Sequence, residues 1–85
     1  MILRLLKKKL IACANMFPIK TEYLWKGKIE SCGEVVAILK TKKSNVEKVR
    51  KEIRYLHCYE IPCMLQIKIS ANEDYASWLL GELNK

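Results

Sequence analysis

A short glycine turn, Lys26-Gly27-Lys28, lies between two long segments whose residues suit β-strands. Side chains in residues 11–25 alternate between two faces, and Pro18 predicts an edge position or a break in that segment. Residues 29–41 include a near-continuous apolar run, typical of a strand covered on both faces, and Gly33 predicts a bulge. Because glycine readily adopts positive φ, the sequence predicts a long β-hairpin that turns at residue 27.

Hydrophobic periodicity predicts helices on both sides of this hairpin. Leu3, Leu6 and Leu10 recur at helical spacing with lysines opposite, which indicates an amphipathic helix over residues 2–10. A second helix follows a capping sequence at residue 44, and its apolar stripe consists of Val46, Val49, Ile53 and Leu56. A final short helix carries Tyr75, Trp78, Leu79 and Leu83.

One more strand is predicted between the last two helices, because residues 64–69 alternate as in a half-buried strand. The order is then helix, hairpin, helix, strand, helix. One additional strand in front would give β-α-β-β-α-β, the ferredoxin-like split βαβ arrangement. We therefore predict an α+β, ferredoxin-like fold that lacks its first strand, in a single domain over residues 1–85.

The chain is basic, with 16 Lys and Arg against 9 Asp and Glu, for a net charge of +7. This charge fits either an acidic partner such as nucleic acid or a solvated basic surface, and we favour the second. Aromatic residues do not interleave with the basic runs, and no glycine-rich phosphate loop is present, so nucleic-acid binding is poorly supported. The sequence contains no catalytic triad pattern, paired catalytic carboxylates or H-E-x-x-H motif, and we predict that the protein is not an enzyme.

The four cysteines are Cys13, Cys32, Cys58 and Cys63. None forms a C-x-x-C pair, which excludes a zinc ribbon and a thioredoxin motif. The sequence shows no secretory signal, so we expect reduced thiols and a cytoplasmic location. No segment approaches the roughly 18 apolar residues of a membrane span, and no membrane association is expected.

Several polar and aromatic motifs follow one another in a fixed order: Cys13-Ala14-Asn15, Trp25-Lys26-Gly27-Lys28-Ile29-Glu30, Lys40-Thr41, His57-Cys58-Tyr59-Glu60-Ile61-Pro62, and Asp74-Tyr75 with Trp78. In this order the chain resembles the CutA family, the divalent-cation tolerance proteins. The resemblance covers about residues 5–83 and implies a ferredoxin-like fold, a tight homotrimer and a link to copper. Family members normally start with a strand and a full helix ahead of this region. We therefore expect the domain to be N-terminally incomplete, and we favour a true start upstream of Met1.

The resemblance implies Cys13 and His57 as copper ligands, and a thiolate with an imidazole is a suitable ligand set for copper. Taken alone, the residues leave other interpretations open. Cys13 fits a buried small hydrophobic residue, and His57 fits a cap at a helix end as well as a site shared with Glu60. Cys58 stands where the family usually has proline. The sequence assigns no role to the remaining thiols, those of residues 32, 58 and 63.

The resemblance also implies that the long hairpin contributes to a subunit interface. An indole beside a glycine turn can anchor such an interface, although it could instead cover its own sheet. We favour the interface, and its predicted residues are Trp25, Lys28, Glu30, Tyr59, Glu60 and Trp78.

These observations lead to two functional hypotheses. In the first, the chain is a cytoplasmic homotrimer that binds divalent metal ions, copper above all, and contributes to cation tolerance by binding without turnover. In the alternative, it is a PII-like structural or signalling trimer that holds a small anionic ligand in the cleft between subunits. Stoichiometric copper uptake separates the two.

Overall fold

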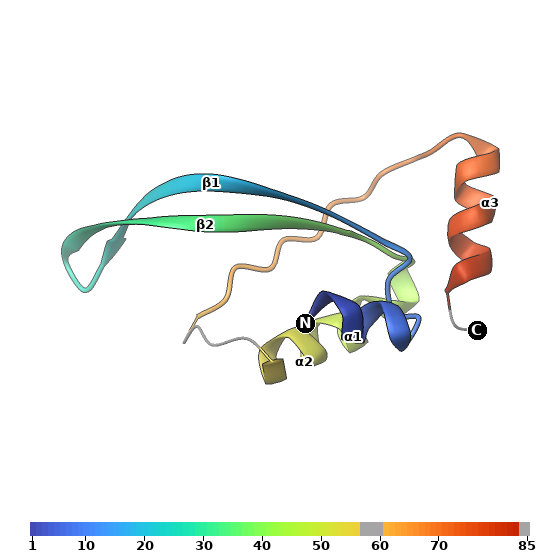
Figure 1. Cartoon of the computed structure of the whole chain (residues 1–85), viewed down its shortest axis with the longest axis horizontal. Helices are drawn as coiled ribbons and strands as arrows, with labels where there is room; N and C mark the ends of the chain where they lie inside the picture. Colours follow the sequence, from blue (N-terminus) through green and yellow to red (C-terminus); the bar gives the residue numbers. More distant parts are fainter. Residues whose placement is uncertain (57–60, 84–85) are drawn as a thin grey trace.

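The computed structural model describes residues 1–56 and 61–83. In this part of the chain the elements follow the order α1 (Ile2–Lys7), β1 (Cys13–Trp25), β2 (Lys28–Lys40), the 3-10 turn η1 (Lys43–Asn45), α2 (Val46–Leu56) and α3 (Glu73–Glu82). The hairpin extends beyond the helices, α1 and α2 lie beneath its base, and α3 stands at the end of a long connecting segment (Figure 1). This combination of an antiparallel sheet with helices is the predicted α+β architecture.

The hairpin turns where the sequence predicted it. Lys26 and Gly27 both have positive φ, 51° and 79°, as a two-residue type I′ turn requires. The register then continues without interruption from Trp25 opposite Lys28 to Cys13 opposite Lys40. No extra residue is inserted on either strand, so the predicted bulge at Gly33 is wrong.

Pro18 lies in the middle of β1, opposite Val35, and the strand passes through it. In a hairpin closed by the pair Trp25–Lys28, hydrogen-bonded and non-hydrogen-bonded pairs alternate, and the Pro18 pair falls in the second class. Its nitrogen therefore points to the outer edge, where no ladder bond is lost. The predicted edge position is confirmed, and the predicted break does not occur.

Helix α1 ends at Lys7, earlier than predicted, because the chain reverses in a Schellman motif. Lys9 has a positive φ of 57°, and the amides of Leu10 and Lys9 donate to the carbonyls of Leu5 and Leu6, each at 3.0 Å. This motif places Leu10 against Leu5. The predicted stripe was partly wrong, since Leu3 is 71% exposed whereas Leu5 is completely buried.

The small core lies between the two N-terminal helices and one face of the hairpin base. Its buried residues are Leu5, Leu10, Ile11 and Val49. Ala14 and Leu39, which pair with each other across the hairpin, pack against this cluster together with Ile53. The apolar stripe predicted for α2 is thus confirmed at Val49 and Ile53, and the base of the hairpin is fixed to the helices.

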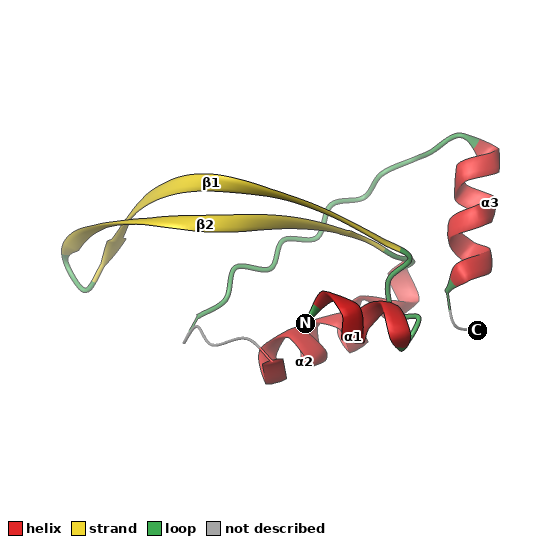
Figure 2. Cartoon of the chain, viewed as in Figure 1, coloured by secondary structure: helices red, strands yellow, loops and turns green. Residues whose placement is uncertain are grey.

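The strand predicted at residues 64–69 does not form. These residues follow an extended path between α2 and α3 but carry no strand, as the loop colouring in Figure 2 shows. The described sheet has only two strands, and no backbone hydrogen bond joins residues 61–71 to another described residue. A strand needs a neighbour to pair with, and in the ferredoxin-like order that neighbour is the first strand, which is not among the described elements.

No helix within residues 1–56 and 61–83 has the length and apolar character needed to cross a membrane.

Candidate functional site

Cys13 is the first residue of β1 and lies at the base of the hairpin. The backbone around it is well held, because Ala12 donates its amide to the carbonyl of Lys40 at 3.0 Å and Cys13 itself pairs with Lys40. Its thiol is half-buried and lies 3.9 Å from Oδ1 of Asn15. The side chain is therefore positioned on a rigid element and remains reachable from outside the protein.

The predicted partner of Cys13 is His57, which lies outside the described residues together with Cys58, Tyr59 and Glu60. Among the residues that the structure does describe, no three His, Cys, Asp or Glu side chains gather closely enough to hold a metal ion. The described residues therefore neither support nor contradict the predicted Cys13–His57 pair, which stays a prediction.

The predicted interface residues of the hairpin tip share one face of the sheet. Trp25 pairs with Lys28, and Glu30 lies two positions further along β2. Side chains alternate between the two faces along a strand, and Ala14, which packs on the helices, is an odd number of positions away from Trp25. Trp25, Lys28 and Glu30 therefore lie on the face of the hairpin opposite to the helices. We call this opposite side, marked by Trp25, Lys28 and Glu30, the open face. Lys26 covers the Trp25 ring from 5.8 Å.

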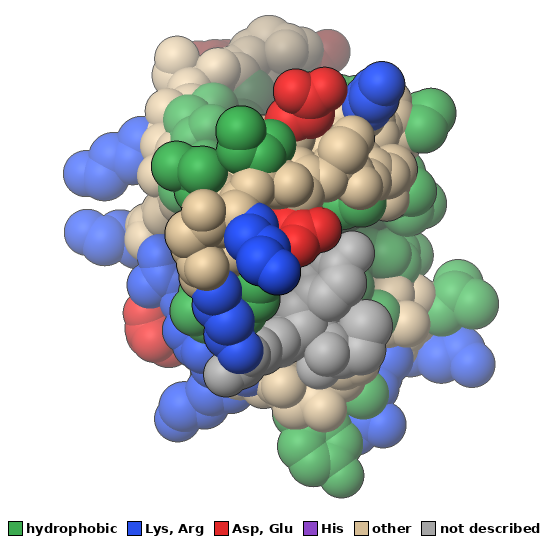
Figure 3. Space-filling view, turned by 90° about the vertical axis from the view of Figure 1, so that its left-hand side faces the viewer, with side chains coloured by type: hydrophobic (Ala, Val, Ile, Leu, Met, Phe, Trp, Pro, Cys, Tyr) green, Lys and Arg blue, Asp and Glu red, His purple; other side chains and the backbone are tan. Residues whose placement is uncertain are grey.

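Large apolar side chains remain exposed along the hairpin. On the open face, Phe17, Tyr23 and Ile38 are each between 41% and 49% exposed. Viewed from the side of the hairpin tip, separate patches of hydrophobic side chains alternate with Lys and Arg side chains, several of which project at the margins (Figure 3). Exposed apolar side chains of this kind are candidates for a contact surface.

Three polar side chains form a cluster on this face that sequence reasoning missed. The Cys32 thiol donates a hydrogen bond to Oε1 of Glu34 at 3.3 Å, and Tyr23 lies beside them. The bond to Glu34 and burial raise the pKa of Cys32, and burial, together with the neighbouring Cys32 and Glu30, raises the pKa of Tyr23. The Cys32 thiol therefore gives up its proton less readily than an ordinary cysteine, which disfavours metal binding at this position.

The last predicted interface residue, Trp78, lies on α3. It is 47% exposed, and its ring lies 5.6 Å from that of Tyr75. Tyr75 in turn lies beneath the ammonium group of Lys40, at 5.3 Å. This cation–π contact connects α3 to the end of β2. Lys40 is the last residue of β2 and pairs with Cys13 at the base of the hairpin.

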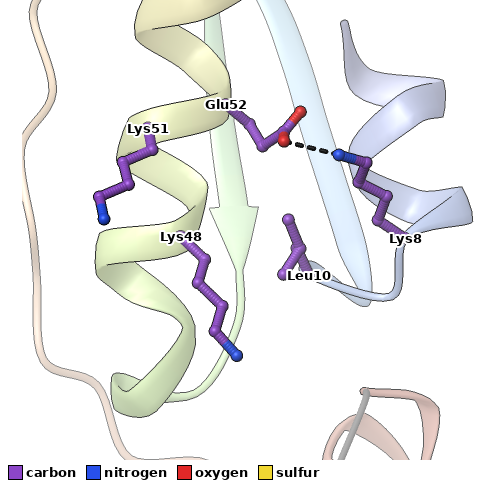
Figure 4. Close-up of a pocket in the computed structure, with 5 residues that line it drawn as sticks. All are labelled: Lys8, Leu10, Lys48, Lys51 and Glu52. Carbon is purple, nitrogen blue, oxygen red and sulfur yellow. Dashed lines mark hydrogen bonds and ion pairs between the residues drawn. The ribbon is translucent and has the colours of Figure 1, made fainter.

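A second cluster joins α1 to α2. Glu52 accepts from Nζ of Lys8 at 2.6 Å and from Nε of Arg4 at 3.1 Å. Figure 4 shows Glu52 and Lys8 pointing toward each other across a shallow pocket of about 420 Å³, which Leu10, Lys48 and Lys51 also line. The hydrogen bond from Lys8 lowers the pKa of the Glu52 carboxyl. Partial burial acts in the opposite direction, and the hydrogen bond from Arg4 lowers this pKa further. The cluster thus fixes the orientation of α1 against α2.

These ion pairs predict a pH dependence of stability. Because the folded-state pKa of Glu52 is depressed, its stabilising effect is present above the ordinary glutamate pKa, about 4.3, and is lost as the pH falls through the lower folded value. Glu52→Gln should therefore lower stability slightly at pH 7, and the difference from wild type should shrink toward pH 3. Urea unfolding at both pH values measures it. The exposed Glu22→Gln serves as the control, and a difference that persists unchanged at pH 3 would contradict the assignment.

Several known proteins are similar to this chain in both sequence and fold. The sequence matches the family described as CutA1 divalent ion tolerance protein over residues 1–82. A divalent-cation tolerance protein CutA of Pyrococcus horikoshii is 45% identical over 82 residues, which make up 95% of this chain and 80% of that protein. In structure, the periplasmic divalent cation tolerance protein CutA of Archaeoglobus fulgidus superimposes with a TM-score of 0.95 at 38% identity, covering 98% of this chain and 82% of the other.

A more distant structure is the PII-like protein CutA of Nostoc sp. PCC 7120 in its apo form. It has 28% identity and a TM-score of 0.89, with 95% of this chain and 81% of the other covered. The order of elements and these neighbours define an α+β protein of the ferredoxin-like class. The chain belongs to the CutA1 divalent ion tolerance protein family, since the match extends over nearly its whole length.

Proposed function

We propose that this chain binds divalent cations, copper in particular, and contributes to cation tolerance as a cytoplasmic homotrimer that acts by binding without catalysis. The observation that carries the proposal is the match of residues 1–82 to a family described as divalent ion tolerance proteins. The described residues add a half-buried thiol on a rigid strand and an exposed apolar face, which are the two features that binding and self-assembly require.

The proposed copper ligands are Cys13 and His57. Both cysteines on the hairpin are half-buried, but the thiol of Cys32 is held by its hydrogen bond to Glu34, so Cys13 is the better candidate of the two. A soft thiolate with an imidazole suits copper in either oxidation state. Metal binding releases the thiol proton, so affinity should increase with pH.

The proposed subunit interface uses the open face of the hairpin. Phe17, Tyr23 and Ile38 are exposed on that face, and exposed apolar side chains are what a partner subunit would cover. The residues that we assign to the interface are Trp25, Lys28, Glu30, Tyr59, Glu60 and Trp78.

Copper titration tests the metal site directly. The wild-type chain should bind about one Cu(II) per subunit, and the Cys13→Ser and His57→Ala variants should each lose at least tenfold in affinity, because a lost ligand weakens binding by more than 1.4 kcal/mol. Calorimetric titration in competition with a chelator measures this. Cys63→Ser, which removes an exposed thiol, is the control that detects adventitious binding. Equal losses in all three variants would contradict the proposed ligands.

Light scattering on the same samples tests assembly, and a mass of three subunits is expected with and without copper.

The alternative function is a PII-like trimer that binds a small anionic ligand between subunits, and the name of the Nostoc relative favours it. A trimer that does not bind copper but binds ATP would support this alternative and overturn the copper proposal.

A further inference from the structure

The positive charge of this chain gathers on one side of the fold. We call residues 1–12 and 41–56, which form α1, α2 and their connections to the hairpin, the helical layer (Figure 1). It contains ten of the 16 Lys and Arg residues but only two of the nine Asp and Glu residues. The helical layer therefore carries a charge of +8, whereas the whole chain carries +7. Positive charge concentrated in this way attracts polyanions.

Two lysines at the pocket between α1 and α2 have no acidic partner in the described part of the chain. Glu52 is the one acidic residue that lines this pocket, and it already pairs with Lys8 and Arg4. Lys48 and Lys51 form no ion pair with a described residue, and both point away from Glu52 (Figure 4). Their ammonium groups are therefore available to an anion from outside the protein.

An exposed aromatic ring lies beside these lysines. Tyr55 follows Lys51 by four positions and Lys48 by seven within α2, and these spacings place the three side chains along one stripe of the helix. Tyr55 is 81% exposed, so its ring can be reached from solvent. Along the sequence Tyr55 lies outside the lysine runs, and only the helix brings it next to Lys51. The stripe thus combines two cations with an aromatic surface.

Single-stranded nucleic acid has both of the groups that this stripe can bind. Its phosphates pair with ammonium groups, and each of its bases has a face that stacks on an aromatic ring. At 1.5 Å per residue, the stripe from Lys48 to Tyr55 extends about 10 Å along α2. That length corresponds to about three nucleotides at 3.4 Å each. A duplex could use the lysines but not the ring, because its bases are already stacked inside the helix.

We propose that the helical layer binds single-stranded nucleic acid. Lys48 and Lys51 hold the phosphate backbone, and the ring of Tyr55 stacks on one base. Binding tolerates many sequences, because stacking does not read the edge of a base, and it weakens as salt is added. The surface lies on the side of the hairpin opposite to the proposed subunit interface, so it stays accessible in a single chain and in a trimer. It also uses none of the proposed copper ligands.

Fluorescence anisotropy on the full 85-residue chain tests the surface. The probes are labelled thymidine and uridine oligonucleotides of about 12 nucleotides, and at least one should bind saturably and more weakly at roughly 200 mM than at 50 mM salt. Lys48→Glu combined with Lys51→Glu should weaken binding at least tenfold. The control combines Lys20→Glu with Lys68→Glu, which changes the net charge equally at exposed positions outside the helical layer. It should weaken binding by a much smaller factor.

Two further comparisons separate stacking and local charge from general attraction. Tyr55→Ala should weaken binding about tenfold, whereas Tyr55→Phe, which keeps the ring, should bind like the wild type. Glu52→Gln removes the acidic group beside the lysines and should strengthen binding severalfold, which Glu22→Gln on the hairpin should not do. Equal losses in the two lysine pairs, or equal binding of the two Tyr55 variants, would overturn the proposal. So would a duplex of the same length that binds as tightly as the single strand.

Discussion

Replacing Leu5 by alanine should lower the free energy of unfolding by about 2–5 kcal/mol. The side chain of Leu5 is completely buried in the cluster that contains Leu10, Ile11 and Val49, so its removal leaves a cavity as well as lost apolar burial. Leu5 also supplies the carbonyl that receives the amide of Leu10, and the contact between these two leucines stabilises the end of α1. A domain of this length is stable by roughly 4–13 kcal/mol, so the expected loss is a large share of the total.

Leu3→Ala is the matched control, because it makes the same chemical change in the same helix at a residue that is 71% exposed. Its effect should remain within about 0.5 kcal/mol. Urea unfolding at one fixed protein concentration measures both variants, since the proposed self-assembly would make apparent stability depend on concentration. Equal destabilisation by the two variants would contradict the assigned orientation of α1.

The hairpin could be predicted from sequence because its signals are local. A turn that tolerates positive φ at Gly27 and two flanking segments of strand-forming residues define it without reference to the rest of the fold. The α2 stripe was equally local, with Val49 and Ile53 at helical spacing. Local signals did not predict every feature within the hairpin, and the bulge expected at Gly33 is absent. A glycine within a strand indicates a bulge only when the register shifts, and the continuous pairing across this hairpin leaves no room for one.

Other features depend on contacts that no local pattern contains. In α1, a helix of six residues, the stripes through Leu3 and through Leu5 are both apolar, and packing against Val49 decides between them. The strand predicted at residues 64–69 has the right alternation but no described neighbour. The Cys32–Glu34 hydrogen bond joins residues two apart on one face of a strand, a spacing that could have revealed it. The Cys13–His57 pair stays a prediction.

The second large effect concerns a buried polar connection at the base of the hairpin. The carbonyl of Leu10 accepts from Oγ1 of Thr41 at 2.6 Å and from Nδ2 of Asn45 at 3.3 Å. Asn45 is only 2% exposed, and the two donors come from opposite ends of the connection between β2 and α2. Together they hold the turn after α1 against that connection, and therefore also set the start of β1 where Cys13 lies.

Asn45→Ala should lower the free energy of unfolding by about 1–3 kcal/mol and Thr41→Val by about 0.5–1.5 kcal/mol. The double variant should lose more than the sum of the two. Each single variant leaves the Leu10 carbonyl one donor, whereas the double variant leaves a buried acceptor without either. Urea unfolding of all four members of this cycle measures the coupling, with the exposed Ser31→Ala as a control for loss of a polar side chain. Strict additivity would show that the two side chains act independently and would refute the shared role of this carbonyl.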